Sequence, residues 1–492
     1  MKNNHIKYKT LMLSAMVLLT TFGCKKTLDI NVSPNNPLIE TTTPEVLFPS
    51  AVGSTAGRVG GELTIIGGIW AQYYTQANAS NQYKTIDAYA LTRNDFNGNY
   101  NELFSGALAD YQLAIKLAVA RSDWRYNLMA TVMKAYTYQV LVDLYDKVPY
   151  TEAFKGLDNL QPKFDDGYTI YVSLLAEINA ALAKDYTSVP LNSDQKKTDF
   201  LFGGDMDLWT QFANTLKLKM YLRMVNAKPA EAQAGITKLY TDGANFLTTG
   251  AGIATFEDAP NSSNPFYEYN VRRLNTTTNL RASKTFTSWL AVNNDPRAKY
   301  YFGTLTPVPM NQGDYTATAI EQPTYAGATV FAQTAKDPVW FISAAESYLM
   351  QAEALERYYG GAGAAAMYEN GVIAAFTQVK LTRDDVPDDY LTSYVEGNFE
   401  QNLEKIIVQK WASFAGSHSL EGFFEQERTG YPKISTVYST DDNYIPGQWV
   451  YSKNGVTSGL FPKRLVYPAS SRDRNSNTPA EVPITTKVWW GK

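Results

Sequence analysis

Cysteine and histidine are nearly absent from this sequence, and their scarcity excludes several kinds of site. The chain of 492 residues contains one cysteine, Cys24, and two histidines, His5 and His418. An intramolecular disulfide bond cannot form, so the stability of the fold has to come from its core. Zinc sites built from histidine or cysteine clusters and HExxH metalloprotease helices are excluded as well. No metal or cofactor is predicted, and His418 is expected to be an ordinary turn residue.

Strong charge and long hydrophobic runs are also missing. The 44 basic and 48 acidic residues give a formal net charge of −4, and no basic stripe stands out. Because phosphate binding needs concentrated positive charge, nucleic acid is not expected as a partner. After the N-terminus, no apolar run approaches the roughly 18 residues that a membrane-spanning helix needs. The only membrane element that we expect is therefore at the N-terminus.

The N-terminus has the features of a bacterial lipoprotein signal. Basic residues precede a mostly apolar run over 11–19, and Gly23 directly precedes Cys24. This apolar run is too short for a mature membrane helix and is typical of a secretory signal. We predict a signal peptide over 1–23, acylation of Cys24, and a flexible lipid-anchored tether over 24–40. An ordinary signal peptide that is cleaved nearby is the alternative.

Aromatic residues and helical periodicity dominate the remainder of the chain. It contains 34 Tyr, 22 Phe and 9 Trp. Over 41–492 we expect a single, mainly α-helical domain in which about four tetratricopeptide-like helix pairs form a scaffold, with few short strands. Tryptophans in the helical patterns are expected in the core: Trp70, Trp209, Trp289 and Trp411. The expected helices cover 44–57, 61–79, 98–119, 125–145, 168–184, 205–226, 229–241, 342–359, 364–381 and 399–415.

Two regions break the helical pattern. Residues 80–97 are polar and aromatic, and residues 242–338 form a long stretch rich in Asn, Thr, Pro and Tyr with one helix near 283–293. Long irregular excursions inside a compact domain are usually functional. The chain after residue 431 is also expected to be mostly irregular. The scaffold is thus predicted to carry long loops that bind a ligand.

Seven sequence blocks, spread over nearly the whole chain, carry a family resemblance. They are MKAYTYQVLVDLYDKVPYTEAFKG (133–156), FGGDMDLWTQFANTLKLKMYLRM (202–224), DPRAKYYF (295–302), AESYLMQAEAL (345–355), EKIIVQKWASF (404–414), EGFFEQERTGYP (421–432) and RLVYPASSRDRNSN (464–477). In this order, behind a lipoprotein signal, the blocks resemble those of the SusD/RagB family of outer-membrane nutrient-binding lipoproteins.

The resemblance implies a location, a partner and a ligand. Family members are lipoproteins of the outer membrane that face the cell exterior and act as a lid on a TonB-dependent, SusC-like barrel. They bind oligosaccharides, or sometimes peptides, and deliver them to the barrel, and they are not known as catalysts. We therefore expect a non-catalytic glycan-binding protein, with a peptide-binding lid as the alternative inside the family.

The best candidate for the ligand site is a pair of loops, TQANASNQYKTIDAY (75–89) and FYEYNVRRLNTTTN (266–279). Both combine asparagine or arginine with aromatic residues that we expect to be exposed. The C–H faces of a sugar ring pack on aromatic rings, while amide and guanidinium groups bind its hydroxyls in fixed directions. The predicted platforms are Tyr83, Tyr267 and Tyr269, and the predicted hydrogen-bonding residues are Asn78, Asn81, Arg272 and Asn279.

A lipid-anchored glycoside hydrolase is the main rival hypothesis. Glu346 and Glu353 lie on one face of an expected helix, and a carboxylate pair could act as acid and base on a glycosidic bond. The helical rise places them roughly 10 Å apart, beyond the usual spacing for that reaction. A structural role is therefore favoured for both. The aspartates of 384–389 could bind calcium, but they lack the spacing of an EF-hand, so a solvated loop is favoured there.

Overall fold

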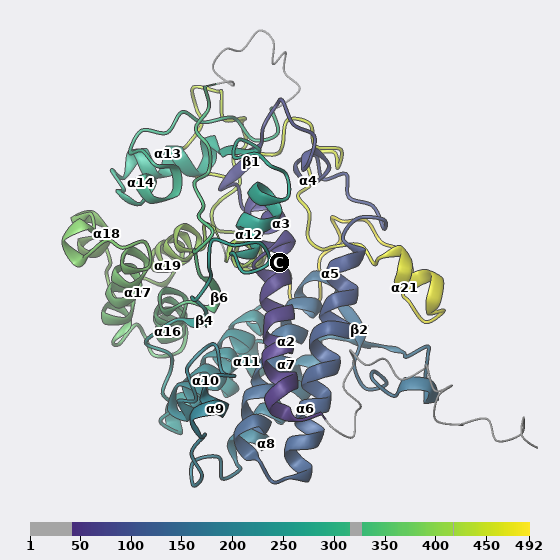
Figure 1. The fold of residues 1–492 in the computed structure, drawn as a ribbon. Helices are drawn as coiled ribbons and strands as arrows, with labels where there is room; N and C mark the ends of the chain where they lie inside the picture. The colour runs from purple at the N-terminus through teal and green to yellow at the C-terminus, as the bar shows by residue number, and fades with distance from the viewer. Residues whose placement is uncertain (1–41, 315–326, 417) are drawn as a thin grey trace, which may run out of the picture. The chain divides into compact units, whose positions relative to one another are not determined.

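Long helices packed in pairs form the scaffold of the described chain (Figure 1). The computed structural model describes residues 42–314, 327–416 and 418–492, so the predicted signal peptide, Cys24 and the tether lie outside the described residues. The long helices are α2 (Pro44–Val59), α3 (Glu62–Trp70), α6 (Ala109–Ala120), α7 (Trp124–Tyr145), α8 (Gly167–Leu182), α10 (Met206–Met224), α11 (Pro229–Thr241), α13 (Lys284–Val292), α16 (Ala344–Tyr358), α17 (Ala364–Gln378), α19 (Phe399–Ser413) and α20 (Ser419–Thr429).

The helices pack mostly with neighbours in the sequence. Consecutive helices pair as α6 with α7, α10 with α11, α16 with α17, and α19 with α20. Helix α2 also packs on α6, α8 on α7, and α20 on α3, which joins the two ends of the domain. Helix α7 is buried along almost its entire length, as its apolar sequence predicts. The prediction of a mainly helical fold with tetratricopeptide-like pairs is confirmed.

Short polar side chains begin several of these helices. The carboxylate of Asp205 accepts a hydrogen bond from the backbone N–H of Leu208 at 3.1 Å, where α10 begins. The Ser343 hydroxyl accepts one from the N–H of Glu346 at 3.1 Å, where α16 begins. Such caps satisfy backbone donors that have no partner within the helix. Pro229 begins α11 at the position where its missing N–H costs nothing.

One continuous helical stretch, 97–120, is long and apolar enough to cross a membrane by length and mean hydropathy alone. It consists of α5 (Asn97–Glu102), a π-helical segment (Leu103–Leu108) and α6. The side chains of Tyr111, Ala114 and Ala118 on α6 are buried, and α6 packs between α2 and α7. We interpret this stretch as a helix of the scaffold.

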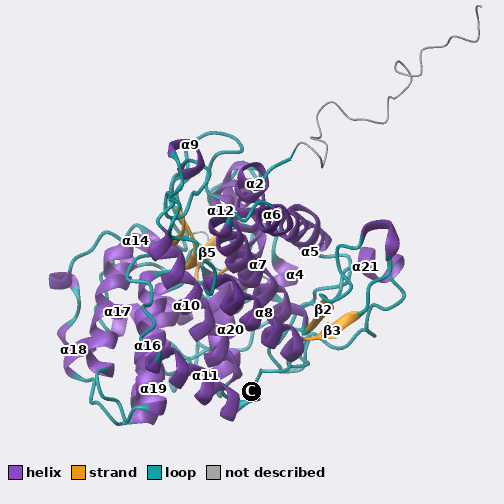
Figure 2. Ribbon diagram, turned by 90° about the horizontal axis from the view of Figure 1, so that it is seen from below, coloured by secondary structure: helices purple, strands orange, loops and turns teal. Residues whose placement is uncertain are grey.

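The strands are few and short, as Figure 2 shows, and each two-stranded sheet joins segments of the chain through antiparallel pairing. The strands are β1 (Tyr74–Gln76), which pairs with β5 (Leu280–Ala282), β2 (Lys147–Pro149), which pairs with β3 (Phe164–Asp166), and β4 (Ala251–Ile253), which pairs with β6 (Val339–Ile342). The short helices are α4 (Lys84–Asp87), α9 (Ser193–Lys196), α12 (Pro265–Tyr267), α14 (Arg297–Phe302), α18 (Asp388–Thr392) and α21 (Ala469–Arg474). Two 3₁₀ turns cover Gly156–Asp158 and Arg383–Asp385.

The expected helix over 61–79 is wrong in its second half. Helix α3 ends at Trp70, and Gln72 takes a left-handed φ of 62° that stops the helix. The next residues form strand β1, in which Tyr74 is fully buried. An unbroken apolar run does not distinguish a buried helix from a buried strand. Here the pairing of β1 with β5, about 200 residues away in the sequence, makes this segment a strand.

The tryptophans that were expected in the core are mostly there. Trp70, Trp209 and Trp411 are buried. Trp289 is only partly buried, and its ring stacks on that of Tyr390 with centroids 5.8 Å apart. Aromatic residues with such contacts contribute to packing and are not free to stack on a ligand.

Candidate functional site

The two loops that were predicted to bind a ligand lie side by side. Strands β1 and β5 bring them together, with Gln76 opposite Leu280. Beyond the strands, the backbone N–H of Ala77 donates to the carbonyl of Asn279 at 2.8 Å. The segment 75–89 therefore runs along the end of the segment 266–279, although nearly 200 residues separate them in the sequence.

The side chain of Asn279 joins the two loops. Its Oδ1 accepts hydrogen bonds from Gln76 Nε2 at 2.9 Å and from Ser80 Oγ at 2.5 Å, and its Nδ2 donates to Asn270 Oδ1 at 3.2 Å. Only 1% of the residue is exposed. The expectation that Asn279 faces a ligand is wrong, because its amide is buried and occupied by partners from both loops.

Tyr83 is not a surface platform either. It is 8% exposed, and it precedes α4 with its backbone N–H donating to Gln76 Oε1 at 2.6 Å. Burial also raises the pKa of its hydroxyl. Asn81 is exposed and Asn78 half-buried at the tip of the same loop, where the Asn78 carbonyl accepts a hydrogen bond from Lys84 Nζ at 3.1 Å. These two asparagines are placed where a ligand could reach them, and their role stays a prediction.

A buried carboxylate that sequence reasoning missed fixes the start of the first loop. Asp87 accepts hydrogen bonds from Thr75 Oγ1 at 2.5 Å, from the Gln76 N–H at 3.0 Å and from Gln312 Nε2 at 2.8 Å. Burial raises the pKa of Asp87 to about 6, against the lowering effect of these donors. The signal in the sequence is an acidic residue inside the apolar run IDAYA, which requires partners if it is buried.

Tyr267, Tyr269 and Arg272 lie on α12 and the π-helical turn Glu268–Arg272 that follows it. Arg272 is already engaged, since its guanidinium is 2.5 Å from Asp258 and 3.1 Å from Glu268. It also lies over the ring of Tyr267, 5.4 Å from the centroid. Of the three predicted residues, Tyr269 lines an open pocket.

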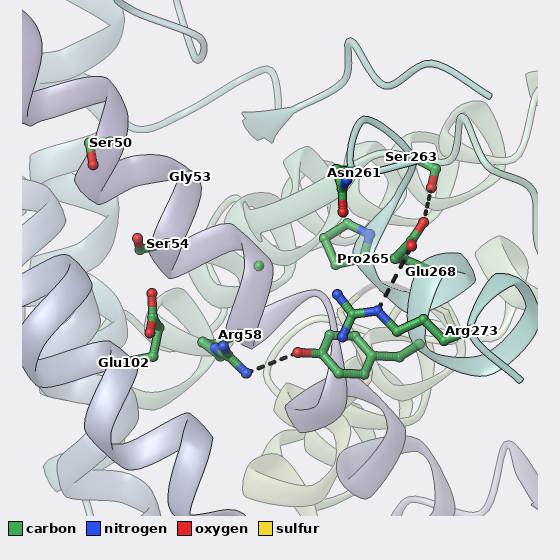
Figure 3. A pocket seen from close by; sticks show the side chains of 12 residues that line it. Ser50, Gly53, Ser54, Arg58, Glu102, Asn261, Ser263, Pro265, Glu268 and Arg273 are labelled. Atoms are coloured by element: carbon green, nitrogen blue, oxygen red, sulfur yellow. Dashed lines mark hydrogen bonds and ion pairs between the residues drawn. The ribbon is translucent and has the colours of Figure 1, made fainter. Parts of the chain in front are cut away.

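The pocket beside Tyr269 has a volume of about 440 Å³ and lies between α2, α5 and the segment 261–273. Figure 3 shows Ser50, Ser54 and Arg58 along one helix, with Glu268 and Arg273 across the pocket from them. We call it the Tyr269 pocket. Its lining residues are Ser50, Gly53, Ser54, Gly57 and Arg58 from α2, Glu102 from α5, and Asn261, Ser263, Pro265, Glu268, Tyr269 and Arg273.

Two arginines hold the Tyr269 ring. Arg58 Nη1 donates to the tyrosine hydroxyl at 2.9 Å, and the Arg273 guanidinium lies 4.4 Å from the ring centroid. Arg58 is also 3.6 Å from the carboxylate of Glu62, whose pKa is raised by burial despite the neighbouring Arg58. A positive charge over the negative face of a tyrosine ring is favourable. The ring therefore has a fixed orientation in the pocket.

The two facing sides of the Tyr269 pocket offer a fixed acceptor, Glu268, and an open helix backbone, that of α2. Glu268 accepts a hydrogen bond from Ser263 Oγ at 2.7 Å and lies 3.8 Å from Arg273. A Cβ atom added at Gly53 or Gly57 would meet no atom within 4 Å, so α2 is bare where it borders the pocket. Hydroxyls, carboxylates and guanidinium groups around one aromatic ring can bind a polyhydroxylated or zwitterionic ligand.

The carboxylate pair of the glycosidase hypothesis is buried and occupied. Glu346 Oε2 is 2.8 Å from His418 Nε2, and its Oε1 is 3.1 Å from Lys219 Nζ. Burial by itself would raise its pKa, but Lys219 and His418 lower the pKa of Glu346 to about 2. Glu353 is 2.6 Å from Arg428, and its pKa is likewise lowered to about 2. Neither can donate a proton near neutral pH, and His418 is a buried partner of Glu346, not an ordinary turn residue.

The aspartates of 384–389 are exposed, as a solvated loop requires. Asp385 caps a turn by accepting hydrogen bonds from the N–H and the hydroxyl of Thr382, both at 2.8 Å. Within residues 42–314, 327–416 and 418–492, no group of three or more His, Cys, Asp and Glu side chains is placed to hold a metal ion.

Comparison with known proteins gives one family match. A SusD-like family model, described as starch-binding associating with outer membrane, matches residues 35–452. No curated protein matches the sequence. A SusD homologue from Bacteroides uniformis is 21% identical with a TM-score of 0.70, and the match covers 91% of this chain and 99% of that one.

Two further solved structures have the same fold. A chitin-binding SusD homologue from Flavobacterium johnsoniae is 20% identical with a TM-score of 0.69, and the match covers 92% of this chain and 96% of that one. A SusD/RagB family protein from Bacteroides thetaiotaomicron is 20% identical with a TM-score of 0.71, over 92% of this chain and 100% of the other. At such identities the likeness concerns the fold.

Proposed function

The chain belongs to the SusD-like family, whose model spans most of its length, and on this premise we propose that it captures an oligosaccharide at the outer membrane and delivers it to a TonB-dependent, SusC-like barrel. The family is described as starch-binding, and two structural neighbours are named as chitin-binding. The protein itself breaks no bond in this proposal, since binding and release suffice for delivery.

The observation that carries the proposal is the Tyr269 pocket. A tyrosine ring of fixed orientation is surrounded by serine hydroxyls, an asparagine amide and charged groups that can accept or donate. The C–H face of a sugar ring packs on such a ring, and its hydroxyls can bond to the groups around it. Tyr269 belongs to the second of the two loops that the sequence singles out, whereas no residue of the first loop, 75–89, lines the pocket.

A binding measurement on two variants of Tyr269 tests this role. Calorimetric titration with starch and chitin oligosaccharides should show that Tyr269→Ala weakens binding roughly tenfold, because the stacking surface is lost. Tyr269→Phe keeps the ring and loses only the hydrogen bond from Arg58, so it should weaken binding by a smaller factor. Equal affinities for the unmodified protein, Tyr269→Ala and Tyr269→Phe would show that Tyr269 does not contribute to ligand binding. Thermal unfolding of each variant controls for the fold.

Anchoring and delivery are separate parts of the proposal. Acylation of Cys24 would hold the protein on the outer membrane, facing the cell exterior, and the segment 24–40 would allow it to move over the barrel. Cys24→Ala should move the protein from the membrane fraction to the soluble fraction without changing its affinity for a glycan. Co-purification with a SusC-like barrel from solubilised membranes tests the partner.

A peptide is the second candidate ligand, and the charges of the pocket favour it. Arg58, Glu102, Glu268 and Arg273 line the same cavity, and groups of both signs can pair with the termini or charged side chains of a peptide. A peptide library in the same titration decides between the two. Release of sugar products on incubation with oligosaccharides would instead support the hydrolase hypothesis.

A further inference from the structure

A second pocket of about 420 Å³ lies between the β4–β6 sheet and the paired helices α16 and α17. It shares no lining residue with the Tyr269 pocket. Trp340 and Tyr348 are its aromatic residues, and the polar ones include Thr249, Asn370 and Gln378. No lysine, arginine, aspartate or glutamate lines it. We call it the Trp340 pocket.

The indole of Trp340 is held in place by Gly252 of the neighbouring strand β4 and by Gly250 just before that strand. Trp340 lies between Val339 and Phe341, which are fully buried, so strand alternation directs its own side chain to the other face of β6. A Cβ atom at Gly250 would be 2.4 Å from Trp340 Cζ3, and one at Gly252 would be 2.9 Å from Cε3. Any larger residue at these positions would displace the indole. One part of the ring thus packs on the β4 backbone, and the rest lines the pocket.

The polar edge of this indole lacks a partner. Trp340 Nε1 is buried and makes no hydrogen bond within the part of the chain that the structure describes. A buried donor without an acceptor costs free energy, which an acceptor on a bound molecule or a water would recover. Trp340 also borders a small cavity of about 30 Å³, space for about one water.

The helices supply the other walls. On α17, Asn370, Ile373, Ala374 and Thr377 follow the i, i+3, i+4, i+7 spacing of one helix face, and all of them line the pocket. Tyr348 of α16 is partly exposed, and among the described residues its ring and hydroxyl have no stacking or hydrogen-bonding partner. Partly exposed aromatic rings and the exposed amide of Asn370 are therefore brought together on three different elements. Gln378 Nε2 already donates to the Ser413 carbonyl at 3.3 Å, so its Oε1 is the atom that it offers to a ligand.

We propose that the Trp340 pocket is a second glycan site, which binds one uncharged sugar ring. The ring's C–H face packs on Trp340 or Tyr348, and its hydroxyls bond to the amides of Asn370 and Gln378 and to Thr249. The lack of charged side chains is what selects this class of ligand, because an ionic ligand would find no counter-charge there. The volume lies within the range of about 300–1,000 Å³ that is usual for small-molecule pockets. The proposal rests on the Trp340 pocket and does not depend on the Tyr269 pocket.

Titration of the full chain with neutral oligosaccharides of glucose and of N-acetylglucosamine tests the proposal. Trp340→Ala should weaken binding roughly tenfold or remove one of two binding events. Asn370→Ala should weaken it less, and since Asn370 is exposed this variant keeps the test valid if Trp340→Ala fails to fold. Trp124→Ala is the matched control, because Trp124 is a partly exposed tryptophan that lines neither pocket.

The outcomes separate this proposal from the one for Tyr269. If Trp340→Ala and Asn370→Ala both bind as the unmodified protein does while Tyr269→Ala is impaired, the second site is refuted and the first stands. If the Trp340 and Asn370 variants are impaired and Tyr269→Ala is not, the Trp340 pocket is the glycan site of this protein. Absence of binding by every neutral sugar, or binding only of peptides with apolar side chains, overturns the proposal.

Discussion

The ion pairs between α10, α16 and α20 and the charges around Tyr269 consist of the same residue types and are arranged in opposite ways. In the first region, Arg428 and Glu353 are fully buried and joined by two bonds of 2.6 and 2.7 Å. In the second, the Arg273 side chain is 53% exposed, and its Nε lies 3.8 Å from Glu268 Oε1. Charges that are buried and paired with one another hold helices together, whereas charges that remain partly exposed to solvent can bind a ligand.

The buried region is an extended network. Arg223 alone contacts three carboxylates, those of Asp143 at 3.0 Å and of Glu421 and Glu425 at 2.8 Å. The network contains Asp143, Lys219, Arg223, Glu346, Glu353, Lys410, Glu421, Glu425 and Arg428. Each charge in it has an opposite charge within bonding distance, so removal of one member leaves its buried neighbours with less compensating charge.

The largest effect is expected from Arg428→Ala. This change leaves the carboxylates of Glu353 and Glu425 without the guanidinium that binds both, and breaking a buried pair in this way costs about 3–5 kcal/mol. Urea denaturation should show the loss directly as a lower free energy of unfolding. Lys238→Ala is the control, because its pair with Asp242 is exposed and should be worth less than about 1 kcal/mol. Similar losses for the two variants would contradict the comparison.

Acid should weaken the buried network. The pKa of Glu346 and that of Glu353 are lowered to about 2, because their cationic partners outweigh the effect of burial. In the unfolded chain a glutamate titrates near 4.5, so the stability that these groups contribute is complete above that pH. It is lost as the pH falls from about 4.5 to about 2. Free energies of unfolding measured across this range should fall steadily, and a flat profile would contradict the assignment.

Glu427 sharpens the comparison, because it is a buried carboxyl beside the network that makes no ion pair among the described residues. Burial raises its pKa to about 8, against the lowering effects of Lys463 and of the Val488 backbone N–H. The unfolded chain ionises first, so wild-type stability falls as the pH rises from about 4.5 to about 8. Glu427→Gln stays neutral and should be more stable than the wild type at pH 9, with the difference vanishing near pH 4.5. Melting temperatures at both pH values test this, and an equal gain at both would point to packing instead of ionisation.

The scaffold could be predicted from the sequence because its signals are local. Pro229 and the apolar spacing after it predict 229–241, the range that α11 has. The chain past Trp70 could not be predicted, since Tyr74 is buried in a strand whose partner lies on β5. The local pattern of residues carries no information about the pairing of two strands that lie about 200 residues apart in the sequence.

The candidate site was predictable only in part, for the same reason. The sequence identifies the loop that carries Tyr269, because aromatic and polar residues alternate there. It does not identify the other wall, since Arg58 and Gly57 reach the pocket from α2, more than 200 residues away. The burial of Asn279 could not be predicted, because two of its partners, Gln76 and Ser80, belong to the other loop, and only the fold brings them within reach.

The smallest effect concerns the glycines of α2 that border the Tyr269 pocket. Gly57 lies inside a helix, where glycine costs about 0.5–1 kcal/mol relative to alanine. A Cβ atom there would meet nothing within 4 Å, so Gly57→Ala should raise the free energy of unfolding by about that amount. The added methyl group would stand in the pocket and should weaken ligand binding, whereas Gly60→Ala, where Cβ would be 2.4 Å from Val339, should destabilise. A gain in stability with undiminished binding would mean that the bare backbone of α2 plays no part in recognition. A gain in stability with weaker binding would mean that the glycine at position 57 lowers the stability of α2 and keeps the pocket open for the ligand.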